Sequence, residues 1–277
     1  MPDESLLSVG NLVVEYASGR FRQPPARVIE DVSFTIARGE TLALVGESGS
    51  GKTTIGKALL GLAPIAGGHV MLGGTDITHV HGRARRALAA DIQVVFQNPY
   101  GSLNPSLTVG RALAEPLLVA GIAKTEVHAR IADLLQRVGL PRDAASRYPA
   151  QFSGGQRQRV AIARAVARQP KLVVCDEPTS ALDVTTQAAV LGLLSELQHV
   201  LGCSYLFITH DLAVVREFAT RTMVLQHGRI VEEGPSREVC DKPRHDYTRK
   251  LVAAAPVPDP HLQRRRRQER MPVLEQS

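Results

Sequence analysis

The octapeptide Gly-Glu-Ser-Gly-Ser-Gly-Lys-Thr at residues 46–53 constrains this chain more than any other segment. It fits the pattern G-x-x-x-x-G-K-[ST], in which glycines let backbone N–H groups wrap a chain of phosphates. The apolar run at 41–45 is typical of a buried strand, and a helical pattern begins at Lys52. Its apolar residues are expected on one helix face: Ile55, Leu59 and Leu62. The segment therefore predicts a strand, a phosphate-binding loop and a helix whose N-terminus points at the anion.

Each polar residue of this loop has a chemical role in the pattern. Lys52 would reach the β- and γ-phosphates of a nucleoside triphosphate, and the Thr53 hydroxyl would hold Mg²⁺. The residues expected to bind the nucleotide here are Gly46, Glu47, Ser48, Gly49, Ser50, Gly51, Lys52, Thr53 and Thr54.

A second segment, Lys-Leu-Val-Val-Cys-Asp-Glu-Pro at 171–178, is an apolar strand that ends in two carboxylates. Burying an uncompensated carboxylate is costly, so a pair at a strand end needs a reason. Asp176 fits a Mg²⁺ ligand, and Glu177 fits a general base that polarises the attacking water. The alternative is a solvated pair at the start of a loop.

A third segment, Phe-Ser-Gly-Gly-Gln at 152–156, begins a helical pattern. Ser153 can cap that helix, and Gln156 completes a capping box. A cap does not require Gly154 and Gly155, which are unfavourable early in a helix. Two glycines instead allow a bulky anion to approach the positive helix end. A nucleotide bound at the first helix terminus could therefore be closed over by this one from another subunit.

Strand patterns dominate the first third of the chain. Alternating apolar and polar segments at 6–45 predict a small antiparallel sheet before the phosphate loop, and residues 69–97 add further short strands. Helical patterns follow and predict an inserted helical subdomain of about 98–168. They lie at about 109–120, 124–138 and 155–168.

Strand and helix patterns alternate after that block, which predicts a mainly parallel sheet with helices on both faces. The expected strands are 172–175, 205–208, 223–226 and 230–231, and the expected helices lie near 184–200 and 211–219. The chain beyond Pro235 is rich in proline and arginine, so we expect it to be only partly ordered.

Composition excludes several classes of protein. A hydrophobic content of 44% with mixed charge favours a globular chain over a disordered one. No apolar run approaches a membrane span, and the N-terminal segment lacks the pattern of a signal peptide. Cys175, Cys203 and Cys240 form no C-x-x-C pair, so we expect reduced thiols and no metal site. His79 and His81 are expected in a solvated loop.

Half of the net charge of +6 lies at residues 261–277, where five arginines and two glutamates give +3. Such a run could contact nucleic acid or anionic lipid headgroups. No aromatic residue lies among the arginines, which favours a solvated terminus instead. No nucleic acid partner is expected.

These motifs together resemble the ATP-binding subunit of ATP-binding cassette (ABC) transporters. The resemblance covers about residues 6–235 and rests on motifs in register: Gly-Glu-Ser-Gly-Ser-Gly-Lys-Thr, Gln97, Phe-Ser-Gly-Gly-Gln, Leu-Val-Val-Cys-Asp-Glu-Pro, Ser180-Ala-Leu-Asp183 and His210. It implies an α/β fold: a P-loop NTPase core with a mainly parallel sheet, an N-terminal antiparallel β subdomain and an inserted helical subdomain. Residues 236–277 would form a C-terminal extension.

The resemblance also implies roles for single residues. Tyr16 would stack on adenine, and Gln97 would sense the γ-phosphate and Mg²⁺ and couple to the membrane subunits. Ser153 and Gly155, with their neighbours Gly154 and Gln156, would contact the γ-phosphate in trans. Asp183 would link the two sites, and His210 would hold the γ-phosphate. Outside this frame, His210 reads as a helix-start residue and Gln97 as an ordinary loop residue.

Two residues of this chain differ from those usual in the family, and two segments resemble a narrower group within it. Phe152 stands where the family usually has leucine, which touches packing rather than the phosphate contact. Residues 97–105 and 245–251 resemble the ATPases of peptide and nickel importers, which usually carry proline at the position of Asp246.

The implied function is an ATPase subunit on the cytoplasmic face of the inner membrane that binds Mg-ATP and pairs head to tail with a second ATP-binding subunit. Two transmembrane permease subunits would be its direct partners, and an extracytoplasmic solute-binding protein an indirect one. A soluble ATPase accessory to an enzyme complex, such as carbon–phosphorus lyase, is the first alternative. A phosphotransferase is the second, although Phe-Ser-Gly-Gly-Gln and His210 would then have no role.

Overall fold

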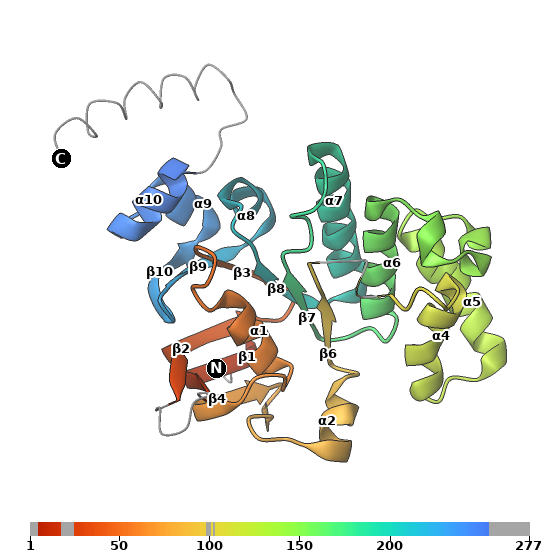
Figure 1. The fold of residues 1–277 in the computed structure, drawn as a ribbon, viewed down its shortest axis with the longest axis horizontal. Coiled ribbons are helices and arrows are strands. Elements are labelled where there is room, and N and C mark those ends of the chain that lie inside the picture. The colour runs from red at the N-terminus through yellow and green to blue at the C-terminus, as the bar shows by residue number, and fades with distance from the viewer. Residues whose placement is uncertain (1–4, 18–24, 98–100, 102, 255–277) are drawn as a thin grey trace.

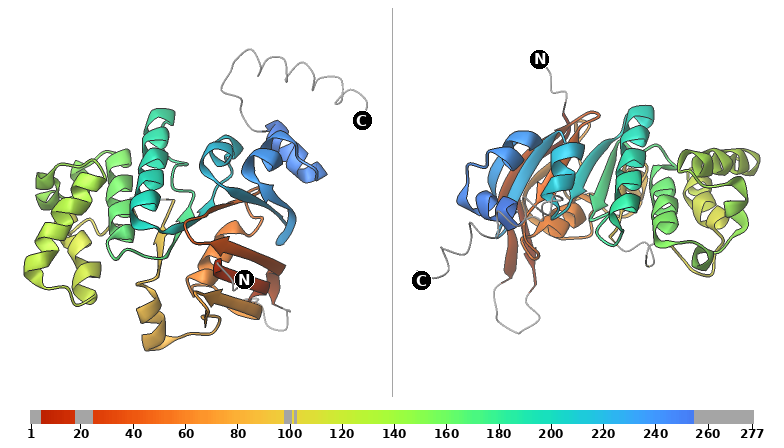
Figure 2. Two further views of the ribbon diagram at one scale, coloured as in Figure 1. Left: turned by 180° about the vertical axis from the view of Figure 1, so that it is seen from behind. Right: turned by 90° about the horizontal axis from the view of Figure 1, so that it is seen from above.

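Two β-sheets form the middle of the molecule, with a block of helices at one end and two C-terminal helices at the other (Figure 1). The computed structural model describes residues 5–17, 25–97, 101 and 103–254. Figure 2 shows from above that the helical block stands away from the antiparallel sheet.

The larger sheet has six strands in the order β10-β9-β3-β8-β7-β6. All neighbouring pairs are parallel except β9 and β10, as expected for a mainly parallel sheet. The central strands are buried along their whole length, which explains their continuous apolar sequences. The strands are β3 (Thr41–Val45), β6 (Ile92–Val95), β7 (Leu172–Asp176), β8 (Ser204–Ile208), β9 (Arg221–Gln226) and β10 (Arg229–Pro235).

The smaller sheet is antiparallel, as predicted, with the order β2-β1-β4-β5. Its strands are β1 (Ser5–Tyr16), β2 (Ala26–Ala37), β4 (Ile65–Leu72) and β5 (Thr75–Asp76). Helix α1 (Lys52–Leu59) lies between the two sheets, and its Ile55 and Leu59 side chains share one apolar core with both of them. The phosphate loop is therefore held on packed elements on either side.

Helix α1 ends earlier than predicted. Gly61 adopts a left-handed conformation with φ of 66°, and the N–H of Leu62 donates to the carbonyl of Lys57 at 2.8 Å. This is the usual glycine-terminated helix end. Leu62 consequently lies beyond the helix and is 62% exposed, so the prediction that it shares a helix face with Ile55 and Leu59 is wrong.

The helical block carries the elements predicted for it. They are α4 (Val109–Val119), α5 (Lys124–Arg137), the short 3₁₀ helices η1 (Arg142–Ser146) and η2 (Pro149–Gln151), and α6 (Gly154–Val166). Helix α7 (Val184–Leu201) lies between this block and the sheet (Figure 1). One apolar core runs from Leu113 in α4 through Val160 in α6 to Val173 and Phe207 in the sheet. Phe152 is buried in the same core.

Helix α2 (Gly82–Leu88) occupies a region where only short strands were predicted. None of its side chains is buried, so it lacks the apolar periodicity that marks a helix in a sequence. The guanidinium of Arg85 donates to the carbonyls of Leu59 at 2.5 Å and Leu60 at 3.1 Å. A polar cap on the end of α1 therefore holds α2 in place.

The chain beyond Pro235 forms two helices in its described part, which ends at Ala254. It forms α9 (Ser236–Asp241) and α10 (Asp246–Ala254), which lie near α8 (Leu212–Phe218) (Figure 1). Val239 and Tyr247 share a small apolar core with Ala43 and Val45 of β3. The arginine-rich residues 261–277 lie outside the described residues.

Three other expectations concern the described part of the chain. No helix in it has the length and apolar character that a bilayer span requires. Cys175, Cys203 and Cys240 are buried and free of disulfides. His79 and His81 are exposed between β5 and α2, as expected for solvated side chains.

Candidate nucleotide site

The phosphate loop follows the buried strand β3 and leads into α1, in the order the sequence predicts. A Cβ atom on Gly46 would lie 2.3 Å from the backbone oxygen of Leu225, so only glycine lets the loop pass β9 this closely. Gly49 has φ of 81° and open space around it, which suits a left-handed turn presenting its backbone to a ligand. The loop is thus both packed on the sheet and open on its outer side.

Lys52 fills the inside of this loop. Its Nζ donates to the carbonyl oxygens of Gly46 at 2.7 Å and Glu47 at 2.8 Å, and the residue is only 6% exposed. Burial lowers the pKa of the ammonium, an effect that the nearby Glu177, Asp176 and Glu47 charges partly oppose. The buried ammonium can offer its charge to a phosphate at once, because the loop already holds it in place.

Thr53 and Asp176 place oxygen atoms together at the foot of the site. The Thr53 hydroxyl donates to Asp176 Oδ1 at 3.0 Å. Burial raises the pKa of Asp176, helped by Glu177 and opposed by the hydrogen bond from Thr53 and by two lysines. Hydroxyl and carboxylate oxygens suit Mg²⁺, which commonly takes one or two protein ligands plus substrate phosphates. The residues present therefore fit a magnesium ion, although the described residues contain no group of three or more His, Cys, Asp or Glu side chains suited to a metal.

Glu177 is held by two partners predicted to share its site. Its Oε1 lies 3.1 Å from His210 Nδ1, and its Oε2 accepts a hydrogen bond from Gln97 Nε2 at 3.1 Å. The side chain of Glu177 is 20% exposed and both of its carboxylate oxygens have partners, so it is not a freely solvated residue. The backbone of Glu177 has φ of 47°, a left-handed conformation that is uncommon for residues other than glycine. Such conformations persist where the surroundings impose them, often at active sites.

Residues of the phosphate loop line one cavity of about 740 Å³ together with Gln97, Glu177 and His210. Its lining consists of Val28, Ser48, Gly49, Gly51, Lys52, Thr53, Thr54, Gln97, Glu177 and His210. The structure thus brings the phosphate loop, the glutamate and the histidine together, as predicted. Val28 of β2 was not predicted, because an apolar residue on a strand gives no local sign of lining a site. Ser50 belongs to the loop itself, and its buried Oγ has no hydrogen-bond partner among the described residues.

Ser153 caps α6 as predicted. Its Oγ accepts from the N–H of Gln156 at 3.3 Å, and the Gln156 side chain accepts from the N–H of Ser153 at 3.0 Å. A Cβ atom on Gly155 would lie 2.4 Å from Cγ2 of Thr186, at the start of α7. Asp183 caps α7 by accepting from the N–H and the hydroxyl of Thr186 at 2.9 and 2.6 Å. Gly155 therefore also has a packing role that the sequence analysis missed.

Several predicted residues do not line the 740 Å³ cavity. Four of them belong to the phosphate loop or the carboxylate pair beside it: Gly46, Glu47, Ser50 and Asp176. The others lie elsewhere: Tyr16, Ser153, Gly154, Gly155, Gln156 and Asp183. Tyr16 is half-buried against the core that α1 shares with both sheets. The N-terminus of α1 therefore lies at the cavity, whereas the N-terminus of α6 lies on a different part of the same protomer.

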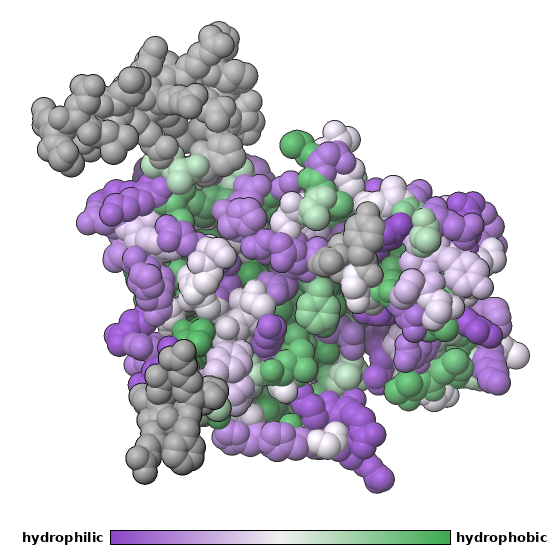
Figure 3. Space-filling view, in the orientation of Figure 1, coloured by the Kyte–Doolittle hydropathy of each residue, from purple (hydrophilic) through white to green (hydrophobic). Residues whose placement is uncertain are grey.

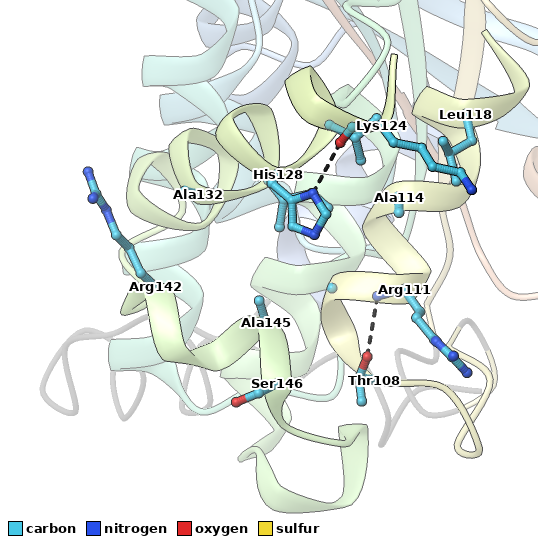
Figure 4. A pocket seen from close by; sticks show the side chains of 13 residues that line it. Thr108, Arg111, Ala114, Leu118, Lys124, His128, Ala132, Arg142, Ala145 and Ser146 are labelled. Atoms are coloured by element: carbon cyan, nitrogen blue, oxygen red, sulfur yellow. Dashed lines mark hydrogen bonds between the residues drawn. The ribbon is translucent and has the colours of Figure 1, made fainter. Parts of the chain in front are cut away.

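A separate hollow of about 560 Å³ lies in the helical block, between α4, α5 and η1 (Figure 4). Its lining combines Ala114, Leu118 and Ile131 with cationic side chains that include Arg111 and Lys124. Apolar side chains also gather at the lower edge of this block in Figure 3. The hollow contains no residue of the glycine-rich loop that lines the first cavity.

Comparison with known proteins decides the family. The sequence profile of the family described as ABC transporter matches residues 29–180, which is more than half of the chain. The chain belongs to the ABC transporter family. This ABC transporter family member also matches, over residues 231–277, the profile of the oligopeptide/dipeptide transporter C-terminal region.

Curated relatives of this ABC family member match most of the chain. The glutathione import ATP-binding protein GsiA of Pectobacterium atrosepticum is 49% identical over 95% of the chain and 43% of its own length. The oligopeptide transport ATP-binding protein OppD of Mycobacterium tuberculosis is 50% identical over 84% of the chain and 38% of its own length. The chain therefore spans less than half the length of these relatives.

Solved structures confirm the predicted fold class. The ATP-binding cassette MJ0796, as a dimer in a post-hydrolysis state bound to ADP and Pi, superimposes with a TM-score of 0.74 at 30% identity. That match covers 83% of this chain and 99% of the other. CbiO1 of Clostridium perfringens, part of the ABC transporter complex cbiONQ, gives a TM-score of 0.77 at 25% identity over 98% of each chain.

Proposed function

We propose that this ABC ATPase hydrolyses Mg-ATP in the 740 Å³ cavity to power the import of a peptide-type solute through two partner permease subunits. One observation carries the hydrolytic part of the proposal: the cavity is lined by a carboxylate, Glu177, held between Gln97 and His210. The names of the relatives, glutathione import and oligopeptide transport proteins, support the choice of import and of solute.

The phosphate loop would bind the triphosphate. Backbone N–H groups of the loop residues that line the cavity, Ser48, Gly49 and Gly51, would surround the phosphates at the N-terminus of α1, where the helix dipole favours an anion. Lys52 would exchange its carbonyl partners in the loop for the β- and γ-phosphates. Thr53 and Asp176 would hold the magnesium ion, which neutralises charge on the phosphates when bound.

Glu177 would act as the general base. Its Oε atoms both face the cavity partners, so a water bound beside the γ-phosphate could give its proton to this carboxylate as it attacks. Gln97 would orient that water together with Glu177. His210, whose ring lies 3.1 Å from Glu177, would hold the γ-phosphate and keep the carboxylate in one orientation.

The residues outside the cavity fit a second protomer. Ser153, Gly155 and the capped start of α6 would approach the γ-phosphate from the partner ATPase, which is a copy of this chain or a related one. Asp183, at the start of α7, would connect the two sites. Tyr16 would stack on adenine. ATP would bridge the two protomers, and its cleavage would release them.

The membrane-spanning path would come from the permease subunits, with an extracytoplasmic solute-binding protein delivering the solute. This ABC ATPase would then be peripheral on the cytoplasmic face of the inner membrane. Purification from its own cells tests this part: permease subunits should co-purify with the chain. Recovery with soluble enzyme subunits alone would instead support an accessory ATPase of an enzyme complex.

Replacement of the base tests the hydrolytic mechanism. Glu177→Gln should retain ATP binding but lose turnover by about 10²-fold or more, because the amide cannot accept the proton. Steady-state phosphate release and equilibrium nucleotide titration measure the two properties. Glu126→Gln, which alters an exposed ion pair on α5, serves as the matched control and should hydrolyse ATP normally. A Glu177→Gln chain that turns over at the wild-type rate would refute the base assignment.

A further inference from the structure

The C-terminal helix α10 contacts the phosphate loop through one hydrogen bond. The N–H of Glu47 donates to the hydroxyl oxygen of Tyr247 at 2.9 Å, across 200 residues of sequence. Neither the loop motif nor the aromatic residue gives a local sign of this contact.

We propose that Tyr247 is a positioning residue for the phosphate loop, and that its hydroxyl sets the affinity of the site for nucleotide. The inference rests on the proposed binding of nucleotide in the 740 Å³ cavity and adds a residue from outside that cavity.

The bond secures one particular peptide unit. The peptide between Gly46 and Glu47 has its carbonyl oxygen bound by Lys52 Nζ at 2.7 Å and its N–H bound by Tyr247 at 2.9 Å. With both ends held, this peptide cannot rotate without breaking a hydrogen bond. Since Gly46 has no side chain to restrict the backbone, the two bonds replace a steric constraint that glycine lacks. Loss of the Tyr247 bond would leave the orientation of the Gly46 carbonyl, and so of Lys52, less defined.

Tyr247 is itself held firmly. The residue is 8% exposed and lies in an apolar core with Val45 of β3 and Val215 of α8. The Glu232 carboxylate fixes the start of α10 by accepting hydrogen bonds from the N–H groups of Arg244 at 2.8 Å and His245 at 3.0 Å. The hydroxyl is therefore presented to the loop from a rigid support, not from a mobile tail.

A phenylalanine at this position would fill the same apolar core without reaching the loop. The ring accounts for packing, whereas the hydroxyl oxygen accounts for the contact with Glu47. The two roles can therefore be separated by removing one atom.

Tyr247→Phe in the full chain tests the inference, with ADP as the probe in equilibrium titrations. We expect ADP binding to weaken by about 3- to 10-fold, the range that one net hydrogen bond supports. The KM for ATP should rise by a similar factor while kcat changes by less than about 2-fold, because a binding interaction has been removed.

Tyr205→Phe is the matched control. The Tyr205 hydroxyl donates to the backbone oxygen of Leu194 at 2.9 Å, in the core and outside the lining of the cavity. Its removal should lower the melting temperature of the nucleotide-free chain and leave ADP affinity unchanged.

Equal ADP affinity in Tyr247→Phe and the wild-type chain would overturn the inference and reduce Tyr247 to a packing residue. A wild-type chain that binds neither ADP nor ATP would instead overturn the proposed function on which the inference rests. The two failures are therefore distinguished by the wild-type titration.

Discussion

Lys52 shows how one residue can be prepared for an anion before the anion arrives. Its Nζ satisfies two carbonyl oxygens of its own loop, Gly46 and Glu47, and burial lowers its pKa. Phosphates would provide several negative charges next to the same atom, and opposite charge raises the pKa of an ammonium. The protonation of Lys52 is therefore linked to nucleotide binding.

This linkage predicts a pH dependence with a definite sign. Above its lowered pKa the free chain has lost the Lys52 proton, so binding must take up a proton, and affinity should fall as pH rises through that pKa, below the ordinary lysine value of 10.5. Calorimetric titration with ADP in two buffers of different ionisation enthalpy measures that uptake. Well below that pKa, where Lys52 is protonated in both states, this group should contribute no proton uptake. An affinity that stays constant over the alkaline range would show that Lys52 does not titrate with binding.

The site residues that lie in contiguous motifs could be predicted from the sequence, since six residues between Ser48 and Thr54 meet Glu177 and His210 around one cavity. It did not foretell the contacts that depend on tertiary approach. Tyr247 reaches Glu47 because β3 and the C-terminal helices share a core, and no pattern along the chain records that. The left-handed backbone conformation of Glu177 could not be predicted either, because no neighbouring residue in the sequence indicates it.

At the scale of elements, the close contact between α6 and α7 depends on the absence of a side chain at Gly155. Gly155 lets helix α6 approach Thr186, whose orientation is held by two hydrogen bonds to Asp183. The same glycine would also leave room for a phosphate in the proposed second protomer. Packing within the chain and the proposed phosphate binding across the dimer therefore both require a residue without a side chain at this position.

Gly155→Ala tests the packing role. Alanine normally stabilises a helix relative to glycine by about 1 kcal/mol, but here its Cβ would lie 2.4 Å from a fixed Thr186 methyl group. We expect the free energy of unfolding to fall by about 1–3 kcal/mol, measured by denaturant titration. Thr186→Ser, which removes the methyl group and keeps the hydroxyl, should restore most of the loss in the double variant.

Gly192→Ala on α7 is the matched control, because a Cβ there meets no atom within 4 Å. This variant should be more stable than the wild-type chain. If Gly155→Ala were stabilised to the same extent as Gly192→Ala, the close approach of α6 and α7 would not constrain the fold.

Most elements were predictable because their apolar residues repeat at the period of a strand or a helix. The parallel strands and the helices α4 to α7 show such patterns, and their predicted limits agree closely with the structure. Helix α2 was missed because polar contacts from Arg85, not a buried face, secure it. The end of α1 was misplaced because Gly61 stops the helix before its apolar pattern ends.

At the scale of the whole molecule, the proposed mechanism requires two ATPase protomers. The Glu177→Gln chain, which should hold ATP uncleaved, is expected to elute with ATP at about twice the 29.9 kDa mass of the monomer, measured by light scattering. Adding Ser153→Arg should prevent pairing, since it places a long side chain at the helix end facing the partner. Ser106→Arg, in an exposed turn, should not. Solitary protomers under all conditions, even beside co-purified partners, would contradict the proposal.

The continuous core between the helical block and the larger sheet has a mechanical consequence. Interiors packed this tightly are stiff and transmit strain. Leu113 of α4 and Cys175 of β7 belong to the same core, and Cys175 directly precedes Asp176 and Glu177 along the chain. A displacement of the outer helices would therefore be transmitted through this core to the strand that carries the two carboxylates.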